Sequence, residues 1–187
     1  MSKSKTNIAM VGFKGKFGNQ YVLRRDHGNT ILASKPEITK KNIAAGQVAS
    51  RNTFRAATEW AKVILKNPVH LEAFKALTHR GQSPYTLATT NYLRLPWFEN
   101  IDTSQYSGVF GDKICVTAFD LYKVVRVTVV IKNPGGTVIE KGDCIKDPLG
   151  ITWDYAAKVA NQNVTGSTVT VVVYNLPKHS VGRVVTL

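Results

Sequence analysis

The chain has 187 residues, 43% of them hydrophobic and 20% charged, which excludes wholesale disorder and allows one large or two small packed domains. The formal net charge of +13 is unevenly placed, because residues 1–96 carry +12 and residues 97–187 carry +1. A field of that sign attracts phosphate polymers, acidic membrane surfaces or acidic proteins. A surface that is charged only for solubility is the alternative interpretation.

The first residues and the two cysteines restrict the setting of the protein. The apolar run at residues 7–13 is too short for a signal peptide, and Lys14 and Lys16 follow it. No apolar run approaches the roughly 18 residues of a membrane helix. We therefore expect a protein of the cytoplasm, or of a particle assembled there, with no membrane span. Cys115 and Cys144 form no metal or redox motif, so we expect both to be reduced, with a disulfide as the minor alternative.

Glycines and a hairpin mark the first forty residues. Gly12, Gly15 and Gly18 form a G-x-x-G-x-x-G pattern that fits neither a Walker loop nor a dinucleotide fingerprint, so we interpret them as places where a strand bends. Residues 20–33 predict a β-hairpin, because two apolar runs flank a turn-forming cluster. Arg24 and Arg25 lie near its tip, where they either contact phosphates or have no role.

Residues 39–95 predict three consecutive helices. The first runs from about Lys40 to Lys66, and Asn67-Pro68 and Ser83-Pro84 start the next two, since Asn or Ser followed by Pro is typical of helix N-termini. The third helix ends before Pro96. Its single basic residue is Arg94, too few for a helix that reads bases in the major groove, so we do not expect sequence-specific DNA recognition.

The second half of the chain predicts strands. Residues 97–112 are irregular and mildly acidic, and we interpret them as a linker. From Lys113 onward the apolar period becomes two, with turn signals between the runs, which is typical of an antiparallel β-sandwich. The expected strands are residues 114–119, 124–132, 137–140, 151–157, 167–174 and 181–187. The predicted fold class is α+β with two domains, a β-hairpin plus three-helix unit at 1–96 and a sandwich at 113–187.

The last 75 residues resemble a bacterial immunoglobulin-like domain. The likeness is carried by Thr168 to Pro177, then Val184 to Leu187, which are similar to the penultimate strand, the polar turn and the last strand of those modules. Trp153-Asp154-Tyr155 resembles the strand that precedes them. The resemblance implies an immunoglobulin-like sandwich used for adhesion, spacing or assembly rather than for catalysis.

The first hundred residues resemble an uncharacterised domain family of Bacteroidota. The matching features are a glycine-rich segment at residues 12–19, a basic hairpin, a proline at Pro36, and then Thr39, Gln47, Arg51 and Phe54. Members of that family carry a C-terminal β domain after this region, so the resemblance implies the same layout here. It implies no activity.

No pattern for catalysis or metal binding is found in the sequence. The four histidines are far apart without metal-ligand spacing, and the aspartates of the second half do not follow a calcium-binding pattern. No nucleophile with a nearby base can be selected. We therefore predict a protein that is not an enzyme and that has no cofactor, no metal and no small-molecule substrate.

Two functions are compatible with these features. The first is a structural protein that forms homo-oligomers or joins a larger particle, with Val184, Val185 and Leu187 as assembly residues and a basic N-terminal domain that faces an acidic partner. The alternative is a protein that binds DNA or RNA, mainly through phosphate contacts. In either case the predicted binding residues are Lys14, Lys16, Arg24, Arg25, Lys40, Lys41, Arg51 and Arg55.

Overall fold

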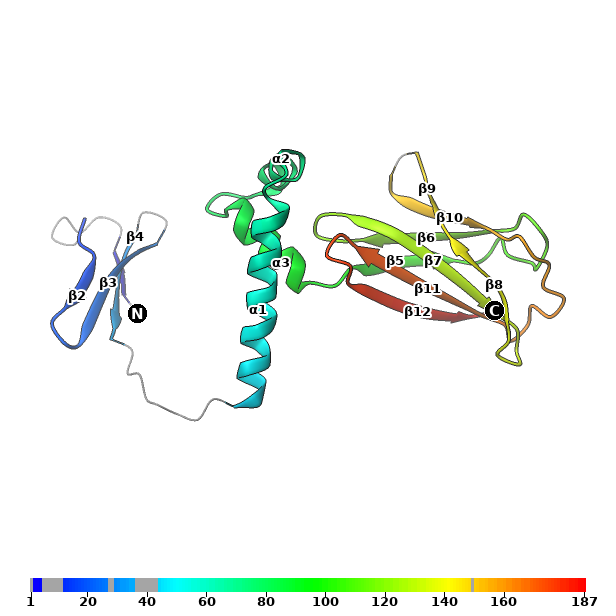
Figure 1. Ribbon diagram of the computed structural model, residues 1–187, viewed down its shortest axis with the longest axis horizontal. Coiled ribbons are helices and arrows are strands. Elements are labelled where there is room, and N and C mark those ends of the chain that lie inside the picture. Colours follow the sequence, from blue (N-terminus) through cyan, green and yellow to red (C-terminus); the bar gives the residue numbers. More distant parts are fainter. Residues whose placement is uncertain (1, 5–11, 27–28, 36–43, 149) are drawn as a thin grey trace. The chain divides into compact units, whose positions relative to one another are not determined.

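The computed structural model describes residues 2–4, 12–26, 29–35, 44–148 and 150–187. The structure contains both helices and antiparallel strands, as the sequence pattern predicted (Figure 1). The chain divides into two compact units, residues 1–48 and 49–187.

The first unit contains an antiparallel sheet with the strand order β1-β4-β3-β2. The predicted hairpin is confirmed, because β3 and β4 pair with Tyr21 opposite Ser34 and Asp26 opposite Asn29. Gly12, Gly15 and Gly18 have φ angles of 94°, 118° and 61°, values that residues with a Cβ atom rarely adopt. The strands are β1 (Ser2–Ser4), β2 (Gly15–Phe17), β3 (Tyr21–Asp26) and β4 (Asn29–Ser34).

The second unit begins with the three predicted helices, α1 (Ala45–Ile64), α2 (Pro68–Leu77) and α3 (Pro84–Leu93). Both predicted caps are confirmed, since the Asn67 side chain accepts a hydrogen bond from Val69 N at 2.9 Å and Ser83 Oγ accepts one from Thr86 N at 3.1 Å. The first turns expected for helix one, at residues 40–43, lie outside the described residues.

The helices pack around a small core that includes residues from the β region. Phe74 of α2 is fully buried, and its ring stacks on that of Tyr122 with centroids 4.3 Å apart. Leu121 packs against the same cluster. The helical core therefore depends on the loop between β6 and β7 for part of its cover.

Eight strands follow the helices and form two four-stranded antiparallel sheets with the orders β5-β6-β10-β9 and β12-β11-β7-β8. The alternation of buried and exposed residues along β6 and β11 explains this arrangement, because one face of each strand lies in the interior. The strands are β5 (Trp97–Asp102), β6 (Lys113–Phe119), β7 (Val124–Lys132), β8 (Val138–Asp143), β9 (Ile145–Lys146), β10 (Thr152–Ala156), β11 (Thr168–Asn175) and β12 (Ser180–Thr186).

The two sheets share one hydrophobic core. Ile114 and Val116 from the first sheet belong to the same buried cluster as Val129 and Val171 from the second. A common core between two sheets is the arrangement of a sandwich. Sandwich-like packing, as the sequence predicted, thus provides the larger of the two cores in residues 49–187.

The prediction of an irregular linker over residues 97–112 is corrected by the structure. Its first part is strand β5, in which Trp97 lies opposite Phe119 and Asp102 opposite Cys115 of β6. A shift of register between Phe98 and Asn100 interrupts the alternation of side chains, so the sequence lacks the regular period that marks the other strands. The compact units accordingly meet at residues 48 and 49, and not at the expected boundary between 1–96 and 113–187.

Candidate functional site

The four predicted cations that the structure describes in the first unit are exposed: Lys14, Lys16, Arg24 and Arg25. Lys16 of β2 lies opposite Val22 of β3, and Arg24 follows Val22 by two residues, so Lys16 and Arg24 share one face of the sheet. Arg25 belongs to the other face, and Lys14 precedes β2. The structure therefore brings two of these four side chains to a common face. Lys40 and Lys41 lie outside the described residues.

Arg51 and Arg55 lie in the N-terminal half of α1, where residues 45–56 are exposed. Their spacing of four residues places them one turn apart on the same face of the helix. Lys62 and Lys66 continue this face at the other end of the helix and beyond it. The sequence identified the individual cations, but the helix places them in a line.

The predicted assembly residues divide between two faces of β12, the last strand. Val184 has 60% of its surface exposed. Val185 lies opposite Val169, which is fully buried, so it points towards the interior of the sandwich. Leu187 is partly buried and packs against the same core. Val184 is thus available to a neighbour, whereas Val185 and Leu187 mainly hold the strand in place.

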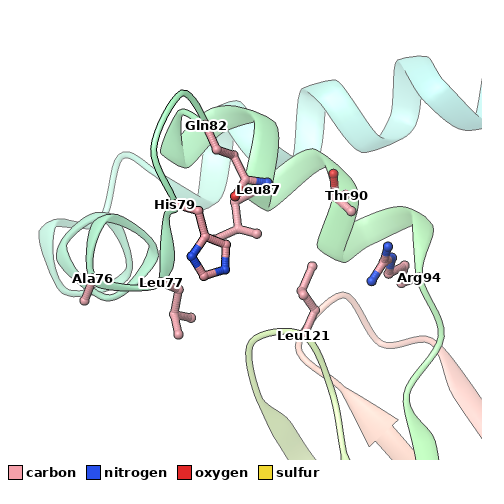
Figure 2. Close-up of a pocket in the computed structure, with 8 residues that line it drawn as sticks. All are labelled: Ala76, Leu77, His79, Gln82, Leu87, Thr90, Arg94 and Leu121. Carbon is pink, nitrogen blue, oxygen red and sulfur yellow. The ribbon is translucent and has the colours of Figure 1, made fainter.

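A pocket of about 480 Å³ lies between the helices and the β6–β7 loop (Figure 2). Leucine side chains and Ala76 provide its apolar surface, and the polar groups come from His79, Gln82, Thr90 and Arg94. None of the described lining residues is acidic. Such a surface suits an apolar group that carries an anion. The complete lining is Ala76, Leu77, His79, Gln82, Leu87, Thr90, Arg94 and Leu121.

Asn175, at the end of β11, connects the three elements beside this pocket. It is fully buried, and its Nδ2 donates to Asp120 Oδ1 at 3.2 Å and to the carbonyl oxygen of Arg94 at 3.5 Å. Its Oδ1 accepts a hydrogen bond from the backbone N–H of His179 at 2.9 Å. One side chain therefore ties the end of α3 to two loops of the sandwich. The sequence offered no signal for it, because these partners are 55 and 81 residues away.

Replacing Asn175 with alanine is expected to lower the free energy of unfolding by about 2–3 kcal/mol, because buried partners would lose their hydrogen bonds. Urea unfolding followed by tryptophan fluorescence measures this loss. Asn133→Ala is the matched control, since Asn133 Oδ1 accepts one hydrogen bond, from Thr137 N in a hairpin turn. The control should cost less than about 1 kcal/mol. Equal losses in the two variants would contradict the role of Asn175 as a connector.

Tyr122 supports the same junction. Its Oη lies 2.9 Å from His70 Nδ1, and burial raises the pKa of the Tyr122 hydroxyl. His179 meets the ring of Tyr92 edge-on, with centroids 4.7 Å apart. The aromatic contacts and Asn175 together fix the helices on the end of the sandwich.

The thiols and carboxylates do not assemble a catalytic or metal centre in the described part of the chain. Asp102, Cys115 and Asp154 lie opposite one another on β5, β6 and β10. Burial, and then the neighbouring Asp154, raise the pKa of the Cys115 thiol, which keeps it protonated and weakly nucleophilic. Both cysteines are free. No group of three His, Cys, Asp or Glu side chains able to hold a metal ion is found among the described residues.

Glu140 and Tyr155 form a polar pair between the sheets. Tyr155 Oη donates to Glu140 Oε2 at 2.9 Å, and the backbone N–H of Lys158 donates to the same oxygen at 2.9 Å. Burial, with the hydrogen bond to Glu140, raises the pKa of the Tyr155 hydroxyl. The pair is enclosed in the sandwich core, where Glu140 Oε1 has no hydrogen-bond partner among the described residues.

Two further findings concern the helices and the similarity of the chain to known proteins. None of the three described helices combines the length and the apolar character needed to cross a bilayer. Comparison with protein-family models, curated proteins and solved structures finds no match to this chain.

Proposed function

We propose that the protein is a non-enzymatic structural component that assembles, with copies of itself or within a larger particle, through the free edge of β12, while its basic surfaces face an acidic partner. The observation that carries the proposal is that β12 is regular and unpaired on its outer side. β12 pairs with β11 over seven consecutive residue pairs without a shift of register, and no described strand pairs with its other side. An unpaired strand edge is a template for a strand from another chain.

The other three edges of the two sheets are less suited to strand addition. β5 and β8 both lie in ladders with register shifts, and β9 has two residues. β8 also places Glu140 towards the interior, and an inward charge is a common protection of sheet edges. On β12 the inward charge is Arg183, whose guanidinium carbon lies 5.8 Å from the centre of the Phe98 ring. The Arg183 side chain is exposed, so its charge is not enclosed in the core as that of Glu140 is.

The backbone of β12 offers its free groups at known positions. Leu187 N–H donates to Ser167 O, and Leu187 O accepts from Gly166 N–H, both at 2.9 Å, so the polar groups of Leu187 face β11. Because these directions alternate along an antiparallel strand, the N–H and C=O of Gly182, Val184 and Thr186 point to the free edge. A neighbouring strand would bind to these groups.

We further propose that the sandwich is immunoglobulin-like, and the order of its strands supports this. Lettered along the chain as A, B, C, C′, D, E, F and G, the eight strands β5 to β12 give one sheet A-B-E-D and another G-F-C-C′. Immunoglobulin-type sandwiches have this division of strands. Modules of this architecture occur in many cell-surface and assembly proteins, which fits a structural role.

Replacing Val184 with proline is expected to abolish assembly, leaving the monomer mass in size-exclusion chromatography with light scattering. Proline removes the outward N–H of β12 without removing a hydrogen bond to β11, a position that edge strands tolerate. Val184→Ala is the matched control, because it shortens the same side chain and keeps the N–H. Circular dichroism of both variants reports that the fold is retained. A folded Val184→Pro protein with wild-type mass would exclude pairing through β12.

A further inference from the structure

We propose that the exposed N-terminal part of α1 around Arg51, Phe54 and Arg55 binds single-stranded nucleic acid, with phosphates on the arginines and a base stacked on the phenylalanine. This inference rests on the proposed function in one respect, since it names the acidic partner of the basic surface. It does not depend on the pairing of β12.

The positive charges on α1 form a line. Positions 51, 55 and 62 are separated by four and seven residues, spacings that return to the same face of a helix, and Lys66 follows two residues beyond its end. At 1.5 Å per residue the line from Arg51 to Lys62 is about 16 Å long, which is enough to follow consecutive phosphates. A linear array of cations matches a linear polyanion better than it matches a compact acidic ligand.

The charges at the exposed end of this line form no ion pair within the described structure, and the pKa of Glu59 is lowered mainly by Lys62 and to a smaller extent by Arg55. Glu59 is the single acidic residue of α1, and its ion pair is with Lys62, at 2.8 Å. Arg51 and Arg55 have no ion pair among the residues that the structure describes, and two like charges one turn apart destabilise a helix. An anion bound across them would remove this repulsion.

Phe54 adds an aromatic surface beside Arg51, on the neighbouring stripe of the helix, because three residues return to within about 60° of the same direction. It lies three residues before Ala57, on the stripe that enters the helical core through Ala57 and Ala61, yet 55% of its surface is exposed. The N-terminal half of α1 extends past α2 and α3 in Figure 1, and residues 45–56 are all exposed. An exposed aromatic ring beside arginines is the combination that proteins use to stack unpaired bases while they hold the backbone. In a duplex the bases are already stacked on each other, so Phe54 favours a single strand.

The test is fluorescence anisotropy of the full chain with a labelled oligothymidylate of about 16 nucleotides and with a duplex of the same length. Phe54→Ala should weaken binding of the single strand about tenfold and leave duplex binding unchanged. The double variant Arg51→Ala/Arg55→Ala should reduce the slope of log affinity against log salt by about 1.4, because each phosphate contact on a single strand contributes about 0.7. The matched control is Lys141→Ala/Lys158→Ala, which removes two exposed lysines of the sandwich and should leave the slope unchanged.

Three outcomes would overturn the inference: equal affinities for duplex and single strand, an unchanged affinity in Phe54→Ala, or an equal loss of slope in the control. Light scattering on the same samples separates this inference from the proposed assembly. Val184→Pro should bind the oligonucleotide as the wild type does, and Arg51→Ala/Arg55→Ala should keep the wild-type mass. A monomeric wild type that binds as described would contradict the assembly alone, and an assembled protein that does not bind would contradict this inference alone.

Discussion

Replacing Phe74 with alanine is expected to lower the free energy of unfolding by about 3–5 kcal/mol, the range for a large aromatic residue lost from a core. Phe74 is fully buried in α2 and stacks on Tyr122 at 4.3 Å. The other buried members of the helical core are Ala61, Ala88 and Leu87, and the larger side chains packed against them are only partly buried. The cavity would therefore be poorly filled by its neighbours, and the contact with the β6–β7 loop would be lost as well.

Urea unfolding curves measure this effect, with Phe54→Ala as the matched control. Phe54 is another phenylalanine of the helical region, but 55% of its surface is exposed, so its replacement should change the free energy of unfolding by less than about 0.5 kcal/mol. A small loss in Phe74→Ala, similar to that in Phe54→Ala, would contradict the stacked junction between α2 and the loop.

Alkaline pH is expected to destabilise the protein through Cys144. Burial, with a smaller contribution from Asp143, raises the pKa of the Cys144 thiol from its ordinary value of 9.0 to about 12. The unfolded chain therefore releases this proton at lower pH than the folded chain does. The stability contributed by the protonated thiol is complete below pH 9, and above it the free energy of unfolding falls by about 1.4 kcal/mol per pH unit until the folded pKa is reached.

Urea unfolding between about pH 8 and about pH 10.5 reports this slope, since the interval begins below the ordinary thiol pKa and ends below the folded one. Cys144→Ala should reduce the fall of the unfolding free energy with pH by the contribution of one proton, about 1.4 kcal/mol per pH unit. Cys115→Ala is the matched control, because Cys115 is only partly buried and the pKa of its thiol is raised less strongly. A Cys144→Ala protein with the wild-type slope would show that other groups cause the alkaline loss.

The elements that the sequence predicted well are those with local physical signals. Asn67-Pro68 and Ser83-Pro84 start α2 and α3 at the expected residues, because a cap and a proline act within one turn. Residues 124–132 form β7 with the expected bounds, and the alternate residues Val127, Val129 and Ile131 are fully buried. The predicted hairpin of residues 20–33 is found as β3 and β4 for the same reason.

The elements that the sequence did not reveal depend on partners far along the chain. β5 was expected to be a linker, and its irregular register explains the missing period. The two-residue strand β9 is too short to give a pattern. Asn175 and Tyr122 look ordinary in the sequence, and their contacts with Arg94 and Phe74 exist only after the helices meet the sandwich.

The candidate functional residues show the same division. Composition identified exposed cations, and those within the described residues are exposed. Helix geometry was needed to place Arg51 and Arg55 in line with later lysines. For the last strand, the sequence treated Val184, Val185 and Leu187 as equivalent, whereas the pleat turns Val184 outward and the other two inward.

The stacked pair of Phe74 and Tyr122 has a consequence for how this chain can be inherited or engineered. A gene fragment that ends before residue 97 would encode helices without the ring that completes their core, and one that begins there would leave that ring bare. A fragment made by recombination or grafting must therefore carry the three helices and the sandwich together.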